Sequence, residues 1–267
     1  MHVATHQGTA LITGASTGIG AVYADRLAAR GYDLLLIARD QVRLGSLASR
    51  LTERHQVRVE VQVADLTVAQ SLGDIAERLR GDSAISLLVN NAGVAMQGTL
   101  ADADPAALLH MLALNVSAPT RLAQAAAVNF AAAGRGAIIN LGSVVALAPG
   151  LFNVAYTATK AYMLSLSEAL QAELAPAGVR VQAVLPGITR TDIWERSGGH
   201  VDQLPAHMVM EAEAMVDAAM RGFDLGETVT IPSLPDAEDW NRLVAARAVL
   251  GPNLSHAQAA PRYRTVA

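Results

Sequence analysis

The chain of 267 residues contains no cysteine, which excludes a disulfide framework, a thiol nucleophile and a cysteine-based zinc site. A strong excess of one charge is also lacking. The net charge is only −4, so we expect no basic surface for nucleic acid. No run reaches about 18 uninterrupted apolar residues, and we expect no membrane span. The first seven residues show no basic-then-apolar leader pattern, so a cytoplasmic location is the default expectation.

Aromatic residues are scarce at 4%, whereas hydrophobic residues make up 52% of the chain. The core must therefore be built from Ala, Val, Leu and Ile, which is typical of a parallel sheet covered by helices. The histidines are scattered. His2 and His6 have helical spacing, but no carboxylate pattern accompanies them, and we expect no metal site.

Short apolar runs alternate with helical patterns along the chain. The expected strands are Thr9–Thr13, Asp33–Ala38, Arg58–Val63, Ser86–Asn90, Ala137–Leu141, Arg180–Leu185 and Thr228–Ile231. The expected helices are Ile19–Arg30, Gln41–Arg54, Val68–Arg80, Ala106–Ala133 and Val154–Ala175, with a broken helical region after Thr191. This alternation predicts a mostly parallel seven-stranded sheet with helices on both faces, in an α/β doubly wound arrangement. No linker divides it, so we expect one domain over 1–267, with a substrate loop region at 190–222.

A glycine-rich loop, Thr13-Gly14-Ala15-Ser16-Thr17-Gly18-Ile19-Gly20, joins the first strand to the first helix. Glycines at these positions allow a tight turn and let the backbone approach a pyrophosphate at the helix start. A structural turn is the alternative, because glycine turns follow many strands. The loop is not a Walker A motif, since no Gly-Lys-Ser/Thr follows, and hydrolysis of ATP or GTP is disfavoured.

The end of the second strand, Ala38-Arg39-Asp40, bears on the choice of dinucleotide. An acidic residue near this position usually bonds the ribose 2′-hydroxyl of NAD. Arg39 can instead hold a 2′-phosphate with its planar fork, and Asp40 can serve only as a helix cap. We therefore favour NADP over NAD.

Lys160 is the only lysine among 20 basic residues, so a compact ammonium is required at this position where arginine was not accepted. Tyr156 stands four residues earlier, on the same face of a predicted helix. Taken alone, such a pair is most often an ordinary surface pair. Its occurrence downstream of a nucleotide loop favours a functional role.

These motifs and their order resemble the short-chain dehydrogenase/reductase family over roughly residues 9–231. The resemblance rests on the glycine loop, Asp65-Leu66, Asn90-Asn91-Ala92-Gly93, Asn115, Ser143, Tyr156 with Lys160, and Pro186-Gly187. It implies a Rossmann domain and a catalytic set made of Asn115, Ser143, Tyr156 and Lys160. It also implies cofactor contacts from Gly14, Ser16, Thr17, Gly18, Ile19, Gly20, Arg39, Asp65, Leu66, Asn91, Ala92, Gly93, Tyr156, Lys160, Pro186, Gly187, Ile188 and Thr191.

The sequence departs from the family pattern at several points. Ser86 stands where an acidic residue is common, and Thr17 stands where NADP users often carry a basic residue. The segment 225–232 also lacks the C-terminal motif found in the reductases of fatty-acid synthesis, so the substrate of those enzymes is not implied.

The implied chemistry transfers a hydride between a nicotinamide and a carbonyl carbon, with Tyr156 as the acid–base. Its ordinary pKa is about 10, and the Lys160 charge is expected to lower it. Ser143 is expected to orient the substrate oxygen, and Asn115 to connect the Lys160 region to solvent. The alternatives are that Ser143 is a turn cap and Asn115 a packing amide.

Apolar side chains in the segments near the reacting carbon favour a bulky, apolar carbonyl or alcohol substrate. They are Val145, Leu151, Phe152, Trp194 and Met208, and loop packing is their alternative explanation. The long helices 106–133 and 154–175 are rich in alanine. The resemblance implies that they pair subunits in a homodimer or homotetramer.

The sequence thus predicts an NADP-dependent oxidoreductase that interconverts a carbonyl and a secondary alcohol. A non-catalytic NAD(P)-binding sensor or scaffold on the same fold is the main alternative, because fold does not fix function. A methyltransferase also uses a glycine loop after its first strand, but it has no use for a Tyr-x-x-x-Lys helix.

Overall fold

The computed structural model describes residues 7–264, so His2, His6 and the segment searched for a leader lie almost entirely outside the described residues. Two compact units divide the chain after Pro232. The larger unit holds the sheet and the helices that cover it. The expectation of one domain over residues 1–267 stays a prediction.

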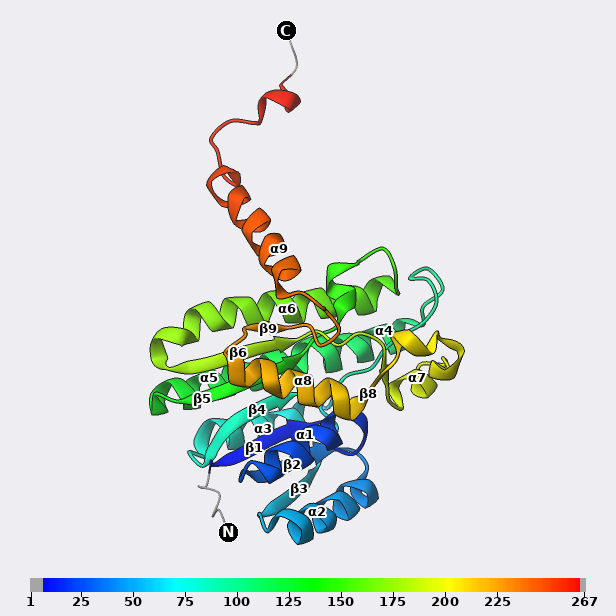
Figure 1. Cartoon of the computed structure of the whole chain (residues 1–267), viewed down its shortest axis with the longest axis vertical. Coiled ribbons are helices and arrows are strands. Elements are labelled where there is room, and N and C mark those ends of the chain that lie inside the picture. Colours follow the sequence, from blue (N-terminus) through cyan, green and yellow to red (C-terminus); the bar gives the residue numbers. More distant parts are fainter. Residues whose placement is uncertain (1–6, 265–267) are drawn as a thin grey trace. The chain divides into compact units, whose positions relative to one another are not determined.

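A seven-stranded, wholly parallel sheet forms the centre of the larger unit (Figure 1). The strand order is β3-β2-β1-β4-β5-β6-β9. From β1 the chain first adds strands toward one edge of the sheet and then, from β4, toward the other edge, as in a doubly wound sheet. The strands are β1 (Thr9–Thr13), β2 (Asp33–Ala38), β3 (Val59–Val63), β4 (Ile85–Asn90), β5 (Gly136–Leu141), β6 (Val179–Val184) and β9 (Val229–Thr230). The predicted fold class is confirmed.

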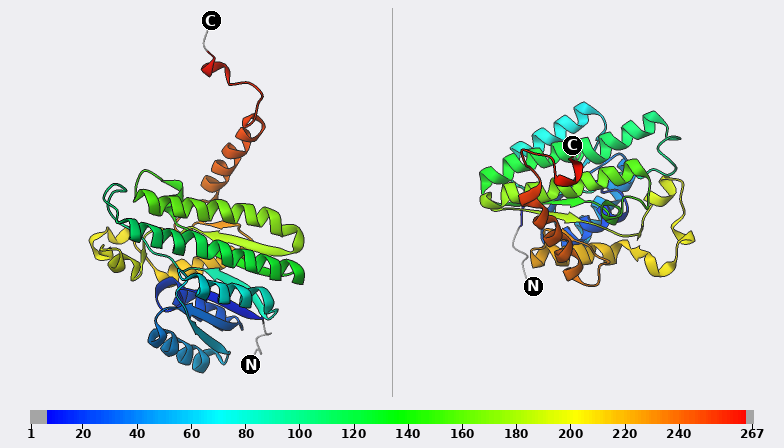
Figure 2. Two further views of the ribbon diagram at one scale, coloured as in Figure 1. Left: turned by 180° about the vertical axis from the view of Figure 1, so that it is seen from behind. Right: turned by 90° about the horizontal axis from the view of Figure 1, so that it is seen from above.

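Helices cover both faces of the sheet. One layer, in front in Figure 1, contains α1 (Gly18–Ala29), α2 (Gln41–His55) and α8 (Ala212–Leu225). The other layer, seen from behind in Figure 2, contains α3 (Ala69–Gly81), α5 (Ala118–Ala133) and α6 (Val154–Leu174). Alternate residues of β2 serve the two layers: Leu34 and Leu36 pack into the first core, Leu35 and Ile37 into the second. A strand buried on both faces must be apolar throughout, which explains the unbroken Leu-Leu-Leu-Ile run.

The expected helix 106–133 is interrupted. It consists of α4 (Pro105–Leu112), a π-helical turn (Ala113–Ser117) and α5. Pro119 has no N–H to donate to the carbonyl of Asn115 four residues earlier, and its ring crowds that carbonyl. The widened turn relieves the conflict, and it lies where the sequence placed a catalytic asparagine.

A small lobe, residues 189–211, leaves the sheet after β6 and returns at α8. It contains β7 (Thr189–Arg190), α7 (Ile193–Arg196), short 3₁₀ turns and β8 (Met210–Glu211), which pairs in parallel with β7. Arg190 makes ion pairs with Asp202 and Glu211, so the two ends and the middle of the lobe are tied together.

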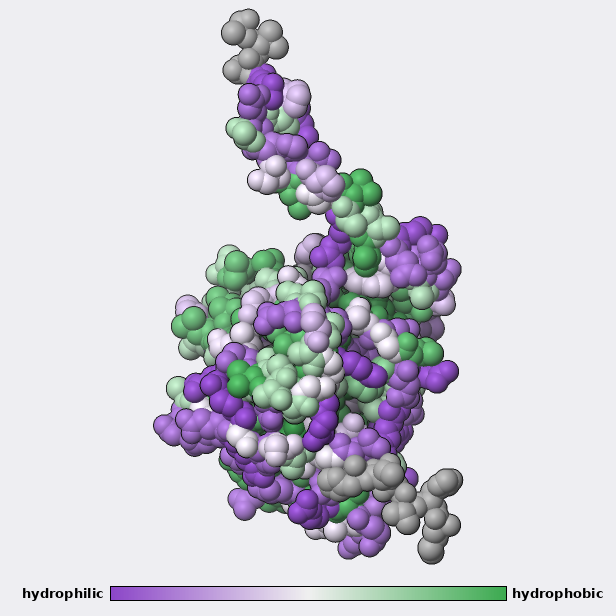
Figure 3. Space-filling model, turned by 90° about the vertical axis from the view of Figure 1, so that its left-hand side faces the viewer, coloured by the Kyte–Doolittle hydropathy of each residue, from purple (hydrophilic) through white to green (hydrophobic). Residues whose placement is uncertain are grey.

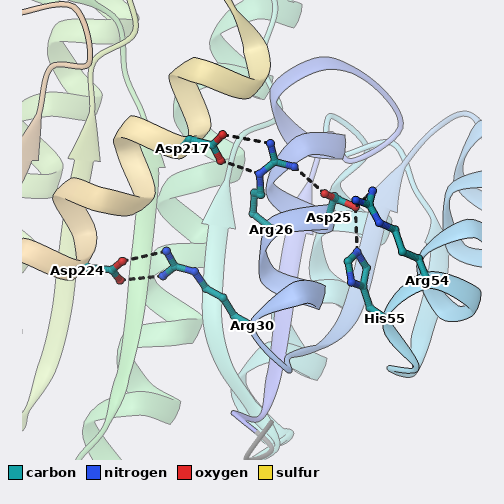
Figure 4. A network of polar contacts seen from close by, with 7 residues as sticks. All are labelled: Asp25, Arg26, Arg30, Arg54, His55, Asp217 and Asp224. Atoms are coloured by element: carbon teal, nitrogen blue, oxygen red, sulfur yellow. Dashed lines mark hydrogen bonds and ion pairs between the residues drawn. The ribbon is translucent and has the colours of Figure 1, made fainter. Parts of the chain in front are cut away.

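Ion pairs join α8 to α1, and α1 to α2 (Figure 4). Arg26 on α1 contacts Asp217 at 2.6 Å, and Arg30 contacts Asp224 at 2.8 Å. The Asp25 carboxylate accepts a hydrogen bond from His55, at the end of α2, over 3.0 Å. The helix that starts at the glycine loop is thereby linked to the helix that follows the lobe.

The smaller unit spans residues 233–267, and in its described part, residues 233–264, the one α-helix is α9 (Ala237–Leu250), capped by the Asp236 carboxylate. None of these described residues is buried, so they form no core of their own. Within residues 7–264, no helix is long and apolar enough to cross a membrane.

Candidate active site

A cavity of about 990 Å³ opens at the carboxyl ends of the parallel strands. Its walls come from the loops after β1, β2, β4, β5 and β6, from the start of α6 and from the lobe. Carboxyl ends of parallel strands are where open α/β sheets bind ligands. Every residue that lines it belongs to the larger unit.

Glycines shape the loop between β1 and α1. Gly14 has φ +64°, a left-handed backbone that favours glycine, and a Cβ there would lie 2.8 Å from the Asn91 amide nitrogen. That amide donates to the carbonyls of Thr13 (2.8 Å) and Gly14 (3.1 Å). The Asn91 side chain therefore ties the glycine loop to the end of β4, a structural contact that the sequence did not reveal.

Ser143 and Tyr156 meet on one side of the cavity. Ser143 follows β5, where its hydroxyl accepts from the Val145 N–H at 3.3 Å and hydrogen-bonds the Tyr156 side chain. Tyr156 lies in the first turn of α6, and the Asn153 side chain caps that turn by accepting from the Tyr156 N–H at 3.0 Å. Ser143 is thus both a turn cap and a neighbour of the phenol, and its expected role toward a substrate oxygen stays a prediction.

Lys160 lies one helical turn after Tyr156, and only 8% of it is exposed. Its Nζ donates to the Leu141 carbonyl at 2.9 Å and lies 5.7 Å from the centre of the Tyr156 ring. Burial lowers the pKa of Lys160 to about 8. The pair is therefore a buried wall of the cavity and not a surface pair.

Asn115 does not contact Lys160. From the π turn its amide spans the backbone of Val94, donating to the carbonyl at 2.8 Å and accepting from the N–H at 2.9 Å. It also donates to the Thr159 hydroxyl at 3.3 Å. Its side chain thus clamps the loop after β4 to α6. The expected link from the Lys160 region to solvent, through water, stays a prediction.

The balance of effects on Tyr156 differs from the expectation. Burial raises the pKa of Tyr156 to about 12, and the hydrogen bond from Ser143 lowers it by less. Burial therefore outweighs the Lys160 charge in setting the pKa of Tyr156. Tyr156 therefore holds its proton at neutral pH.

Arg39 and Asp65 stand at the far end of the cavity from Tyr156, at the tips of β2 and β3. Their charged groups are 3.9 Å apart, and Arg39 is largely exposed. Asp40 caps α2 by accepting from the Arg43 N–H at 3.0 Å, which is the structural role expected as its alternative. Arg39 therefore supplies a positive charge to the lining at this end of the cavity.

Most of the predicted cofactor residues line the cavity. They are Gly14, Ser16, Thr17, Gly18, Ile19, Arg39, Asp65, Leu66, Asn91, Ala92, Gly93, Tyr156, Lys160, Pro186, Gly187, Ile188 and Thr191. Gly20 and Asn115 lie behind this wall, since neither is part of the lining. A Cβ at Gly20 would lie 2.4 Å from the Gly14 carbonyl oxygen, so Gly20 allows close packing instead.

The substrate end is lined mainly by apolar side chains. Val145, Phe152 and Trp194 belong to the lining, whereas Leu151 and Met208 do not, and both are exposed. The sequence reading missed several lining residues from the loop after β4 and from the lobe: Val94, Met96, Gln97, Gly199, His200, Gln203 and Leu204. Only the meeting of two distant segments reveals them.

Comparison with known proteins identifies the chain. The family model for short chain dehydrogenases matches residues 8–201. The chain belongs to this family. An uncharacterized oxidoreductase of Staphylococcus saprophyticus is 31% identical over 69% of this chain and 79% of its own length. The dehydrogenase is thus an enzyme that acts on alcohol and carbonyl groups and binds a nicotinamide dinucleotide.

Two solved structures are similar over nearly the whole dehydrogenase. A short-chain dehydrogenase from Sphingobium yanoikuyae in complex with NADPH is 50% identical, with a TM-score of 0.94 over 96% of this chain and 100% of that one. A bulky-bulky ketone specific alcohol dehydrogenase from Comamonas testosteroni is 47% identical, with a TM-score of 0.90 over 98% and 100%. Both alignments extend beyond the region that the family model covers.

Proposed function

We propose that this dehydrogenase uses NADPH to reduce ketones that carry two bulky, apolar groups, with Tyr156 as the proton donor. The observation that carries the proposal is the placement of Tyr156, Ser143 and Lys160 on one wall of an open cavity whose substrate end is largely apolar. The reverse reaction, oxidation of the secondary alcohol, uses the same groups.

The residues present fit a dinucleotide. The glycine loop has no side chain at Gly14 and Gly18, so backbone N–H groups near the start of α1 can face a pyrophosphate. Gly18, Thr191, Ile188 and Lys160 line one continuous cavity with Arg39 at its other end. We propose that Lys160 holds the nicotinamide ribose and that Ile188 and Thr191 hold the carboxamide.

When bound, the coenzyme supplies a hydride to the carbonyl carbon. The Ser143 hydroxyl holds the substrate oxygen beside the phenol, and Tyr156 delivers its proton to that oxygen. Burial favours this direction, because a phenol with a pKa near 12 carries its proton at neutral pH. A catalytic proton of this kind contributes about 10²–10⁴-fold to a rate.

The preference for NADP over NAD is proposed from Arg39. Its guanidinium lies at the cavity end where the adenosine belongs, and the nearby Asp40 is engaged at the start of α2. The NADPH complex of the relative from Sphingobium supports this choice. Thr17 in place of a basic residue leaves Arg39 as the main contact for a 2′-phosphate.

We also propose a homodimer or homotetramer formed through α5 and α6. These helices lie side by side, with the Thr120 and Tyr162 hydroxyls 2.9 Å apart. Val128, Val154 and Tyr162 are exposed on them, and Figure 3 shows hydrophobic residues gathered on the body at about the height of these helices. Light scattering of the purified protein tests the subunit number.

A cytoplasmic location stays a prediction.

The decisive experiment follows NADPH absorbance with a panel of ketones that differ in the size of both groups. We expect turnover of ketones with two bulky groups. Tyr156→Phe is expected to reduce kcat by about 10³-fold while the Kd for NADPH changes less than twofold. A variant as fast as the parent enzyme would rule out Tyr156 as the proton donor.

A further inference from the structure

Two segments far apart in the sequence meet across the substrate end of the cavity. The loop after β4 contributes Gln97, and the lobe contributes Gly199. A Cβ at Gly199 would lie only 2.4 Å from Nε2 of Gln97 and 3.6 Å from the Trp194 ring. The Gln97 amide therefore rests on the bare α-carbon of Gly199. Figures 1 and 2 show the lobe and the start of α4 at the same end of the sheet.

Backbone conformation does not explain the glycine at position 199. Its neighbour Gly198 has φ +83°, in the left-handed region, whereas Gly199 is outside that region. Any residue could adopt the backbone of Gly199, and the space above it is occupied by Gln97. The missing side chain is thus accounted for by the room that Gln97 needs.

The backbone is fixed on both sides of this contact. In the loop after β4, the Gly98 carbonyl accepts from the Asn153 side chain at 2.9 Å. In the lobe, the Gly199 N–H donates to the Trp194 carbonyl at 2.8 Å, and the Trp194 indole donates to Thr189 at 2.9 Å. A group added at the contact cannot be absorbed by an easy backbone shift. The flexible Gln97 side chain must move instead.

The Gln97 side chain is exposed, and its amide lies against the α-carbon of Gly199. Within the part of the chain that the structure describes, no side-chain hydrogen bond to Gln97 is found. Steric contact with Gly199 therefore limits where the amide can lie. Because Gln97 also lines the cavity, its position determines the space left for a substrate group.

We propose that Gln97 and Gly199 form a size gate that determines which ketones fit. This inference rests on the proposed ketone reduction, since it assigns the limit on one of the two carbonyl substituents. Trp194 forms the fixed side of the gate, and Gln97 is its movable side. None of the three exchanges a proton with the substrate.

The gate makes the effects of two substitutions depend on each other. Gln97→Ala removes the amide and is expected to raise kcat/KM for a diaryl ketone over that for a methyl ketone by about threefold to tenfold, a range typical of small changes in an apolar pocket. Gly199→Ala displaces the amide and is expected to change the same ratio at least threefold. With Gln97→Ala already present, Gly199→Ala is expected to change it less than about 1.5-fold, because its methyl group enters vacated space.

The control is Gly150→Ala, in the loop before α6. A Cβ at Gly150 meets nothing within 4 Å, and its backbone is outside the left-handed region. This variant is expected to leave the ratio unchanged. The Kd for NADPH is expected to stay within twofold of the parent value in all four proteins.

A second set of proteins carries Tyr156→Phe alone, with Gln97→Ala, with Gly199→Ala, and with both. Each is saturated with NADPH, and calorimetry measures its Kd for the diaryl ketone. Binding requires no turnover, so this arm separates the gate from the reaction. Coupled effects in Kd support the gate even if no ketone is reduced, in which case only the proposed function fails. Additive effects, or no binding to any variant, overturn the gate.

Discussion

At the scale of single residues, Tyr156 is governed by two opposed environments. The cavity wall withdraws the phenol from water and favours its neutral form, whereas the Ser143 hydroxyl stabilises the phenolate. Lys160 is itself buried, so its own charge is disfavoured and its pKa is lowered to about 8. A lysine in this state is a weaker electrostatic partner than the sequence alone suggests. In the proposed mechanism, the protonated phenol is the form that serves ketone reduction.

The pH dependence follows from these directions. Tyr156 keeps its proton below its raised pKa and loses it above, so ketone reduction is expected to hold its rate up to about pH 9. Alcohol oxidation needs the phenolate and is expected to rise with pH over the same range. Ser143→Ala removes the bond that lowers the pKa, so the rise in kcat/KM for oxidation is expected to move to higher pH. A rise in kcat/KM for oxidation that moves to lower pH in this variant would contradict the assigned role of Ser143.

Arg39 gives a second prediction at this scale. Arg39→Asp places a carboxylate where a 2′-phosphate is expected, so repulsion replaces a charge-assisted bond. The ratio of kcat/KM for NADPH over NADH is expected to fall by at least 100-fold. Arg43→Gln is a useful control, because Arg43 lies outside the cavity lining and contacts Asp192 at 3.1 Å. An unchanged ratio in Arg39→Asp would place the 2′-phosphate elsewhere.

At the scale of elements, local pattern predicts what local physics determines. The strands were found within two residues of their expected ends, because central strands such as β2 and β4 are apolar runs buried on both faces, whereas the edge strand β3 alternates apolar and polar residues. The π turn was missed, since its cause is one proline, Pro119, in an otherwise regular helical pattern. The lobe was expected as an irregular stretch within a substrate loop region at 190–222, without its two short paired strands. Its contact with Gln97 joins segments about 100 residues apart, and no local pattern reports such a contact.

The π turn leads to a prediction about Asn115. Asn115→Ala leaves the N–H and carbonyl of Val94 without their partner, which is expected to cost about 1–3 kcal/mol in the free energy of unfolding. The loop after β4 is also released, so the KM for NADPH is expected to rise several-fold. Asn129→Ala is the matched control, because that buried asparagine also holds two carbonyls, of Leu79 and Asp82. It is expected to lower stability similarly without raising KM. Equal KM values in the two variants would reduce Asn115 to a purely structural residue.

At the scale of the whole molecule, the sheet, both hydrophobic cores and every residue of the cavity lining belong to the unit that ends at Pro232. From Ser233 to the last described residue, Arg264, there is one α-helix and no buried residue. Burial of apolar surface is the main source of stability, so the larger unit contains what it needs to fold.

Truncation after Pro232 tests this conclusion. The shortened chain is expected to keep the circular dichroism of an α/β protein, a single cooperative unfolding transition and a Kd for NADPH within twofold of the full chain. The reason is that no cavity residue is removed and no residue of α9 is buried. Titration calorimetry and thermal unfolding measure these properties. A truncated chain that unfolds or loses NADPH would show that residues 233–267 complete the fold, as one domain over 1–267 requires.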